Sequence, residues 1–220
     1  MSEVFEQGKE NKVRQLREKA AYDKQTVFAV LDAALVAHVA FVQDGAPVVV
    51  PMIYGREGDT LYLHGARKAR VVRMLEQMPR VCLNVTLVDG IVFARSAFNS
   101  SMNYRSATVY GTPRLIGDED GKLHGMKVIS EHTMPGRWDE LREPLEREVK
   151  MTGVIALHIE SASAKVSDTM PDDEEEDYEI PIWAGVLPIE ASLTALQSDE
   201  RVLDGVTPSA VVRQLEGRTL

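Results

Sequence analysis

The sequence has a single cysteine, Cys82, and lacks any apolar run near the roughly 18 residues needed to cross a bilayer. One thiol excludes an internal disulfide and is typical of a reducing compartment. The first residues, Met1-Ser2-Glu3, have neither the basic nor the apolar stretch of a secretory signal. We therefore expect a cytoplasmic protein that does not enter a membrane.

The motifs of several common enzyme classes are also missing. There is no G-x-G-x-x-G or G-x-x-x-x-G-K-[ST] loop for nucleotides, no H-E-x-x-H zinc motif and no G-x-S-x-G nucleophile turn. One cysteine and five scattered histidines form no metal-ligand pattern. The formal charge of −9 argues against broad contact with nucleic acid or anionic membranes. A phosphate-bearing ligand would have to be held by cationic side chains.

What is present predicts a mainly β protein. The 220 residues are 44% apolar, enough for one domain with its own core. Turns are expected at Asp44-Gly45 and Asp89-Gly90. Strands of an antiparallel meander are predicted at Val36–Val42, Pro47–Tyr54, Thr60–His64, Arg80–Val88, Ile91–Phe98 and Gly153–Val166. A further strand, which follows "SMNYRS", is predicted to end at Ile116. Helices are predicted at Lys12–Ala20, after an Asp23 cap, at Ala66–Gln77, 119–132 and 138–150, and after Thr207-Pro208.

Charged residues are clustered at two places. The acidic run Asp172–Asp177 predicts a solvated loop, because like charges repel and extend a chain. In "YLHGARKAR", Gly65 lets the backbone turn, and Arg67, Lys68 and Arg70 are expected on the first turn of a helix. The N–H groups and positive dipole there favour phosphate. A small phosphate site and an ordinary solvated helix face both stay open.

Further polar and aromatic residues have two interpretations each. His64 ends a predicted strand, as either a hydrogen-bonded structural residue or a proton donor that titrates near neutral pH. Trp183 is either core or part of a site, and the segment 134–138 either lines a site or starts a helix. The strand start "SMNYRS" is crowded with hydroxyls and amides, which indicates that it holds a polar group.

Several longer segments occur in a characteristic order. They are "VRQLREKAAYDKQTVFAVLDAALVAHVAFVQDGAPVVVPMIYG", "LYLHGARKARVVRML", "VCLNVTLVDGIVFARSAFNSSMNYRSATVYGTPRLI", "MPGRW" and "SAKVSDTMPDDEEEDYEIPIWAGVLPI". Together they resemble the pyridoxamine 5'-phosphate oxidase-like flavoproteins, in the branch with nitroimidazole-resistance-type proteins. The resemblance spans Val13 to Ile189. It implies an antiparallel, Greek-key-like split β-barrel with peripheral helices, a homodimer, and FMN between the two subunits.

The resemblance also implies a set of cofactor-binding residues and a domain division. Residues 1–189 would form the FMN-binding domain, with the N-terminal helices and the tryptophan segment, and residues 190–220 a helical tail. The basic residues that vitamin-forming members use for a second phosphate have no match here, so pyridoxamine phosphate is not the expected substrate. The implied contacts are Val50, Pro51 and Met52 beside the flavin ring, Gly65 and Ala66 by backbone, Arg67, Lys68 and Arg70 at the phosphate, and Tyr104, Arg105, Ser106 and Trp183 around the site.

The expected function is an FMN-dependent oxidoreductase that acts on a small molecule. His64 is the candidate proton donor as well as a cofactor contact, and a nicotinamide is the candidate electron donor. Two alternatives stay open, because the fold does not determine the cofactor or the turnover. One is a flavin-binding module without catalysis, and the other is a relative that binds haem or deazaflavin.

Overall fold

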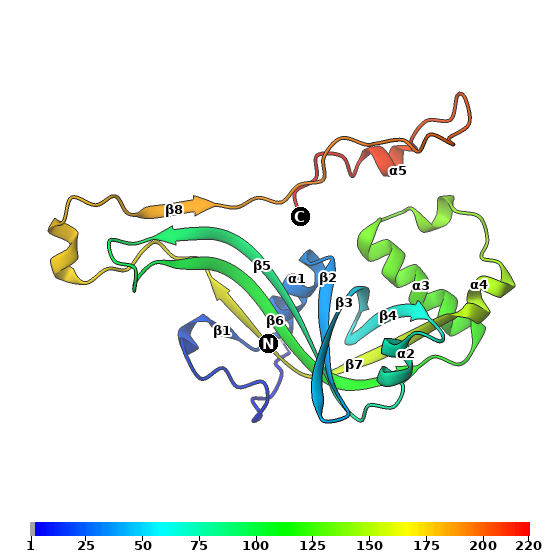
Figure 1. The fold of residues 1–220 in the computed structure, drawn as a ribbon, viewed down its shortest axis with the longest axis horizontal. Coiled ribbons are helices and arrows are strands. Elements are labelled where there is room, and N and C mark those ends of the chain that lie inside the picture. The colour runs from blue at the N-terminus through cyan, green and yellow to red at the C-terminus, as the bar shows by residue number, and fades with distance from the viewer. Residues whose placement is uncertain (1–2) are drawn as a thin grey trace. The chain divides into compact units, whose positions relative to one another are not determined.

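The structure, a computed structural model, describes residues 3–220 as eight strands joined by helices and short 3-10 turns (Figure 1). The strands are β1 (Ala20–Ala21), β2 (Val36–Gln43), β3 (Ala46–Glu57), β4 (Thr60–Ala66), β5 (Val81–Phe93), β6 (Ser101–Leu115), β7 (Thr152–Ser167) and β8 (Gly185–Pro188). The α-helices are α1 (Lys24–Ala33), α2 (Arg70–Leu75), α3 (Glu119–Thr133), α4 (Glu146–Met151) and α5 (Ala210–Arg213), and the 3-10 turns are η1 (Arg17–Lys19), η2 (Trp138–Glu140) and η3 (Glu175–Glu179).

The strand order confirms the predicted mainly β, antiparallel fold. It runs β1, β7, β4, β3, β2, β5 and β6, with β8 paired to β5. A further pairing of β6 with β7 closes this order into a ring. Val36 lies opposite Ile53 between β2 and β3, and His64 lies opposite Val154 between β4 and β7. Among the described residues, no helix is both long and apolar enough to traverse a bilayer.

The described chain groups into two compact units, each made of three separate stretches. Unit 1 consists of the residues up to Ala34, Asn84–Tyr110 and Glu160–Glu190. Unit 2 consists of Leu35–Leu83, Gly111–Ile159 and Ala191–Leu220. The predicted division into a domain of residues 1–189 and a tail of residues 190–220 stays a prediction.

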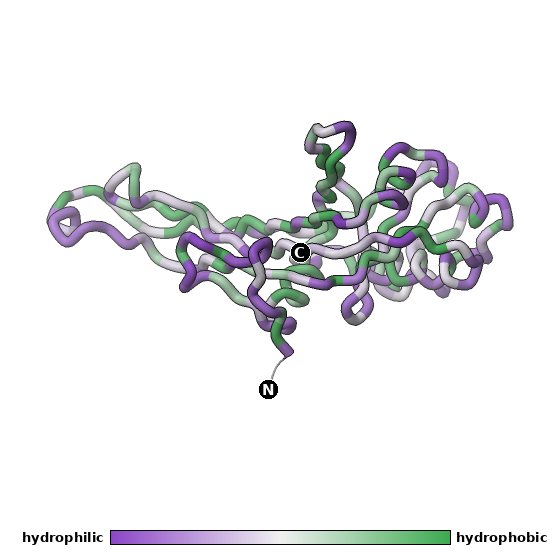
Figure 2. Tube along the Cα trace, turned by 90° about the horizontal axis from the view of Figure 1, so that it is seen from below, coloured by the Kyte–Doolittle hydropathy of each residue, from purple (hydrophilic) through white to green (hydrophobic). Residues whose placement is uncertain are grey.

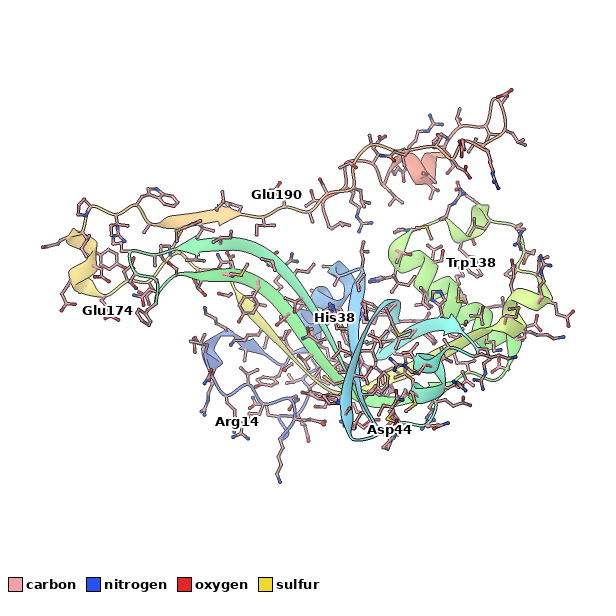
Figure 3. The ribbon with its side chains drawn as sticks, in the orientation of Figure 1. Arg14, His38, Asp44, Trp138, Glu174 and Glu190 are labelled. Atoms are coloured by element: carbon pink, nitrogen blue, oxygen red, sulfur yellow. The ribbon has the colours of Figure 1, made fainter. Side chains whose placement is uncertain are left out.

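Unit 2 shows how the sequence pattern produces a buried and an exposed sheet face. Successive side chains of a strand point to opposite faces, so alternate residues share an environment. On β2 and β3, one set enters the core: Ala37, Val39, Phe41, Met52 and Tyr54 are buried. The alternate residues are exposed although most of them are apolar, and they include Val36, Val42, Val49 and Ile53. His38, which is labelled in Figure 3, belongs to the same exposed face.

Two local predictions at the first helix and the first hairpin are confirmed. The Asp23 side chain accepts a hydrogen bond from the Thr26 amide at 2.8 Å and so caps α1. This bond lowers the pKa of the Asp23 carboxyl below its usual value. Asp44 and Gly45 both have positive φ, 51° and 78°, as expected of the tight turn that joins β2 to β3.

Three predicted helices differ from the structure. The helix at Lys12–Ala20 is wrong, because the chain forms only the turn η1 and then enters β1. The helix at 138–150 is wrong as one element, since η2 and α4 are separate and Pro144 between them disfavours helical backbone before it. The helix predicted at Ala66–Gln77 is shorter, because β4 continues to Ala66 and α2 begins at Arg70.

The predicted turn at Asp89-Gly90 is wrong, because β5 runs straight through it. Gly90 pairs with Pro188 of β8. A Cβ on Gly90 would lie 3.1 Å from a Val186 methyl carbon and 3.2 Å from the Leu187 carbonyl oxygen. The glycine therefore admits a close neighbouring strand rather than a reversal of the chain.

The acidic run is solvated only in part. Glu174, Glu175 and Glu176 are exposed, and the run is a purple segment at the left of Figure 2. Asp173 contradicts the prediction, since it is only 8% exposed. Its carboxylate accepts hydrogen bonds from the Arg95 amide at 2.8 Å and from Arg95 Nη1 at 3.0 Å. One member of the run thus anchors the others within unit 1.

Candidate functional site

In unit 2, the end of β4 carries the first group of predicted residues. His64, Gly65 and Ala66 pair with residues 152–154 at the start of β7. A Cβ on Gly153 would lie 2.6 Å from one Val72 methyl, and a Cβ on Gly65 would lie 3.0 Å from the other. The two glycines therefore let α2 pack directly on the strand ends, which gives Gly65 a structural reason beside its predicted cofactor contact.

The turn between β4 and α2 positions the basic residues. Arg67 and Lys68 lie in this turn and Arg70 begins α2, so the expectation that all three occupy a first helical turn is wrong for Arg67 and Lys68. The Arg67 amide already donates to the Met151 carbonyl at 2.8 Å. Because α2 has only six residues, phosphate binding here would depend on side-chain charge rather than on a helix dipole.

Two of the three cations are available to an anion. The Arg67 guanidinium contacts both carboxylate oxygens of Glu76, at 3.1 and 3.2 Å. Lys68 and Arg70 are exposed, and neither has an ion-pair or hydrogen-bond partner within residues 3–220. Unpaired Lys and Arg side chains are the groups that form charge-assisted hydrogen bonds to phosphate. The geometry therefore favours Lys68 and Arg70 over Arg67.

His64 is a half-buried histidine at the same strand end. Its Nδ1 atom is buried and has no hydrogen-bond partner among the described residues. Burial lowers the pKa of His64 below its usual value, because desolvation disfavours the imidazolium. The neutral ring suits a hydrogen bond to a ligand, or ligation of a metal, better than the predicted role of proton donor.

The predicted ring-side strand lies on β3, opposite β2. Val50 pairs with Val39, and Pro51 pairs with His38. Met52 is 8% exposed and belongs to the core of unit 2, whereas Pro51 is exposed. A flat ligand along this strand would therefore meet the Pro51 ring and the backbone, not the Met52 side chain.

Unit 1 carries the second group of predicted residues. Tyr104, Arg105 and Ser106 are half-buried on β6. Arg105 donates from Nε to one oxygen of Asp89 at 2.9 Å and from an Nη to the other at 2.7 Å. This bond to Asp89 raises the pKa of Arg105. Two of the five N–H donors of Arg105 are thus used within unit 1, and its contact with a flavin stays a prediction.

Trp183, the predicted closing aromatic, lies just before β8 in the same unit. Its side chain is 70% exposed, and its ring centroid lies 5.9 Å from that of Phe93. The indole is therefore not routine core. It is available to a ligand or a partner surface, and its predicted role stays a prediction.

Sequence and structure comparisons place the chain in a known family. The family model described as pyridoxamine 5'-phosphate oxidase matches residues 23–166. The chain belongs to this family. No curated protein matches the sequence.

Among solved structures, two similar proteins share more than a third of their residues with this member of the pyridoxamine 5'-phosphate oxidase family. The flavocytochrome Anf3 from Azotobacter vinelandii has 37% identity and a TM-score of 0.90, over 96% of this chain and 98% of that one. The FAD and haem binding protein from Mycobacterium smegmatis has 36% identity and a TM-score of 0.87, over 90% and 98%. A candidate 5-nitroimidazole antibiotic resistance protein from Bacteroides thetaiotaomicron has 26% identity and a TM-score of 0.58, over 67% and 86%. The predicted split barrel and family resemblance are confirmed.

In this family member, part of the polar strand start is structural, which sequence reasoning missed. Asn103 is 5% exposed, and its side-chain amide donates to the Thr169 carbonyl at 3.0 Å. Its side-chain oxygen accepts from the Thr169 amide at 3.1 Å. Asn103 therefore ties β6 to the chain that leaves β7. The crowded hydroxyls and amides gave no signal of which residue would take this role.

Two further clusters of unit 2 were also not predicted. His124 Nε2 lies 2.7 Å from a Glu57 carboxylate oxygen, in an open depression that also contains Lys127 and Glu131. Within residues 3–220, no three His, Cys, Asp or Glu side chains form a metal site. The second cluster is a cavity between α3 and α4 that includes Trp138, from the segment whose role stayed open on sequence.

Proposed function

We propose that this member of the pyridoxamine 5'-phosphate oxidase family binds a flavin nucleotide and uses it in the oxidation or reduction of a small molecule. The observation that carries the proposal is the end of β4, where Lys68 and Arg70, exposed and without a partner among the described residues, follow half-buried His64. Lys68 and Arg70 would bind the phosphate, and His64 would offer its unpaired nitrogen to the ligand. A bound flavin supplies the electron-transfer chemistry, while the protein orients it.

FMN is the cofactor that the resemblance implies, and FAD is the alternative supported by the name of the M. smegmatis protein. A second candidate function is that of a flavocytochrome, supported by the names of Anf3 and the M. smegmatis protein. His64 fits such a function, because a neutral imidazole nitrogen is a common axial ligand of haem iron. The substrate, the nicotinamide donor and a cytoplasmic location are further proposals, the last resting on the single cysteine.

The absorption spectrum of the purified protein, expressed with added riboflavin and haem, tests both functions. We expect flavin bands, with FMN or FAD released on denaturation, and a Soret band if the flavocytochrome proposal is correct. Anaerobic reduction by NADH or NADPH, followed by reoxidation with an acceptor, would separate an enzyme from a binding module. Absence of bound flavin, together with no binding of added FMN or FAD, would contradict the proposed function.

We also propose that the protein is a homodimer that uses the exposed face of β2 and β3. Val36, Val42, Val49 and Ile53 on this face are 43%, 58%, 59% and 43% exposed. Contiguous exposed apolar side chains usually mark an interface, and a second copy can cover such a face by two-fold symmetry. Sedimentation should show a dimer at micromolar concentration that Val49→Lys weakens. A stable monomer of the unaltered protein would contradict this proposal.

A further inference from the structure

Unit 2 contains a cavity of about 390 Å³ that none of the predicted cofactor residues lines. It lies between α3, the turn η2, residues 141–145, α4 and Thr152 at the start of β7. Figure 1 shows α3 and α4 together, and Figure 3 labels Trp138 beside them. The volume falls within the range of about 300–1,000 Å³ that is typical of small-molecule sites.

The walls of this cavity are mainly apolar. Leu123 and Met126 lie three residues apart on α3 and share one face of the helix. Trp138 adds an aromatic surface, and the thioether of Met126 packs well against rings. The remaining apolar lining residues are Leu141, Pro144 and Val149. Such walls suit a flat, largely apolar body.

Four charged side chains line the cavity, and two of them, Arg142 and Glu148, pair with each other. Arg142 binds both carboxylate oxygens of Glu148, at 2.9 and 2.5 Å. This pairing with Arg142, with the Leu145 amide at 2.8 Å, holds the pKa of Glu148 at about 2. Each of these two charges is therefore satisfied by the other. Glu143 is exposed, so its carboxylate stays hydrated.

Lys122 is the cation at the cavity that lacks a carboxylate. Its only partner among the described residues is the Val149 carbonyl oxygen, at 3.4 Å. Lys122 is half-buried, which makes an unbalanced charge more costly than at an exposed site. Trp138 also lines the cavity, and no hydrogen bond among the described residues involves its indole N–H. The Lys122 ammonium is therefore available to pair with a ligand that carries one negative charge.

We propose that this cavity is a second binding site, for a small aromatic monocarboxylate. The Lys122 ammonium pairs with the carboxylate of the ligand, and Trp138 and Met126 contact its ring. The proposal does not depend on flavin binding, because no residue of the cavity belongs to the predicted flavin contacts.

Calorimetric titration of the full chain with 2-naphthoate and with its uncharged amide, 2-naphthamide, tests this site. We expect naphthoate to bind at least about 10-fold more tightly than naphthamide, because only the carboxylate forms a charge-assisted bond. Lys122→Met keeps most of the apolar stem and should remove this preference by weakening naphthoate alone. Trp138→Ala should weaken both ligands.

Lys127→Met is the matched control. Lys127 lies on the same helix but pairs with Asp139 at 3.2 Å and does not line the cavity. Its replacement should leave both affinities unchanged. Equal affinities of the unaltered protein for naphthoate and naphthamide would overturn the proposal without any variant, and so would equal effects of Lys122→Met and Lys127→Met. Absence of naphthoate binding at millimolar concentration would also overturn it.

Discussion

Replacing Lys68 and Arg70 together with alanine is expected to lower the affinity for FMN by about 10- to 100-fold for each cation removed. The affinity for riboflavin, which lacks the phosphate, should change little. Both side chains are exposed and have no protein partner within residues 3–220, so their charges are available to a ligand. Their removal leaves no buried carboxylate unpaired, and the fold should be unaffected.

Fluorescence titration of the apoprotein with each flavin measures the two affinities. Arg73→Ala is a matched control, because Arg73 is an exposed arginine of α2 that lies one turn further from β4. A general effect of positive charge would lower FMN affinity in the control by as much as in Arg70→Ala alone. If the double variant lost FMN and riboflavin affinity equally, the two side chains would not contact phosphate.

Gly111→Ala is expected to destabilise the protein by about 3 kcal/mol, at the upper end of the usual cost of overpacking. A Cβ at this position would lie only 2.0 Å from the His158 carbonyl oxygen and 3.1 Å from the carbonyl carbon. Both atoms belong to the backbone of β7, so no side-chain rotation can relieve the clash. One of the two strands has to move, which disturbs the pairing of β6 with β7.

Urea unfolding of the apoprotein measures this loss. Gly117→Ala is the matched control, because no described atom lies within 4 Å of a Cβ built on Gly117 and its φ is not positive. Its free energy of unfolding should change by less than about 0.5 kcal/mol. Similar values for the two variants would show that β6 and β7 do not approach each other as closely as described.

Predictions from neighbouring residues were reliable where no distant segment of the chain intervenes. The alternation of Ala37, Val39 and Phe41 with exposed residues was readable, because side-chain direction in a strand has a period of two. The Asp44-Gly45 turn and the Asp23 cap could also be predicted, because each depends only on residues within a few positions in the chain. The turn at Asp89-Gly90 failed because β8, almost a hundred residues later, lies against Gly90.

The candidate site divides in the same way. The order of the motifs was sufficient to indicate the family, and "HGARKAR" was sufficient to indicate a cationic strand end. The sequence could not show that Arg67 forms an ion pair with Glu76, whereas Lys68 has no such partner among the described residues. Nor could it show that Asp89, sixteen residues away in the chain, holds Arg105.

By itself, the sequence determined the mainly β class, the first hairpin and the family, because periodicity and turn chemistry are properties of nearby residues and the order of motifs is read directly along the chain. Only the tertiary structure decided which charges are free, because ion pairing falls steeply with distance and joins residues far apart in the chain. The sequence also could not show that Trp138, Met126 and Lys122 line one cavity, because a cavity forms only where separate elements of the fold pack together. The burial that lowers the pKa of His64 likewise arises from packing and not from its neighbours in sequence.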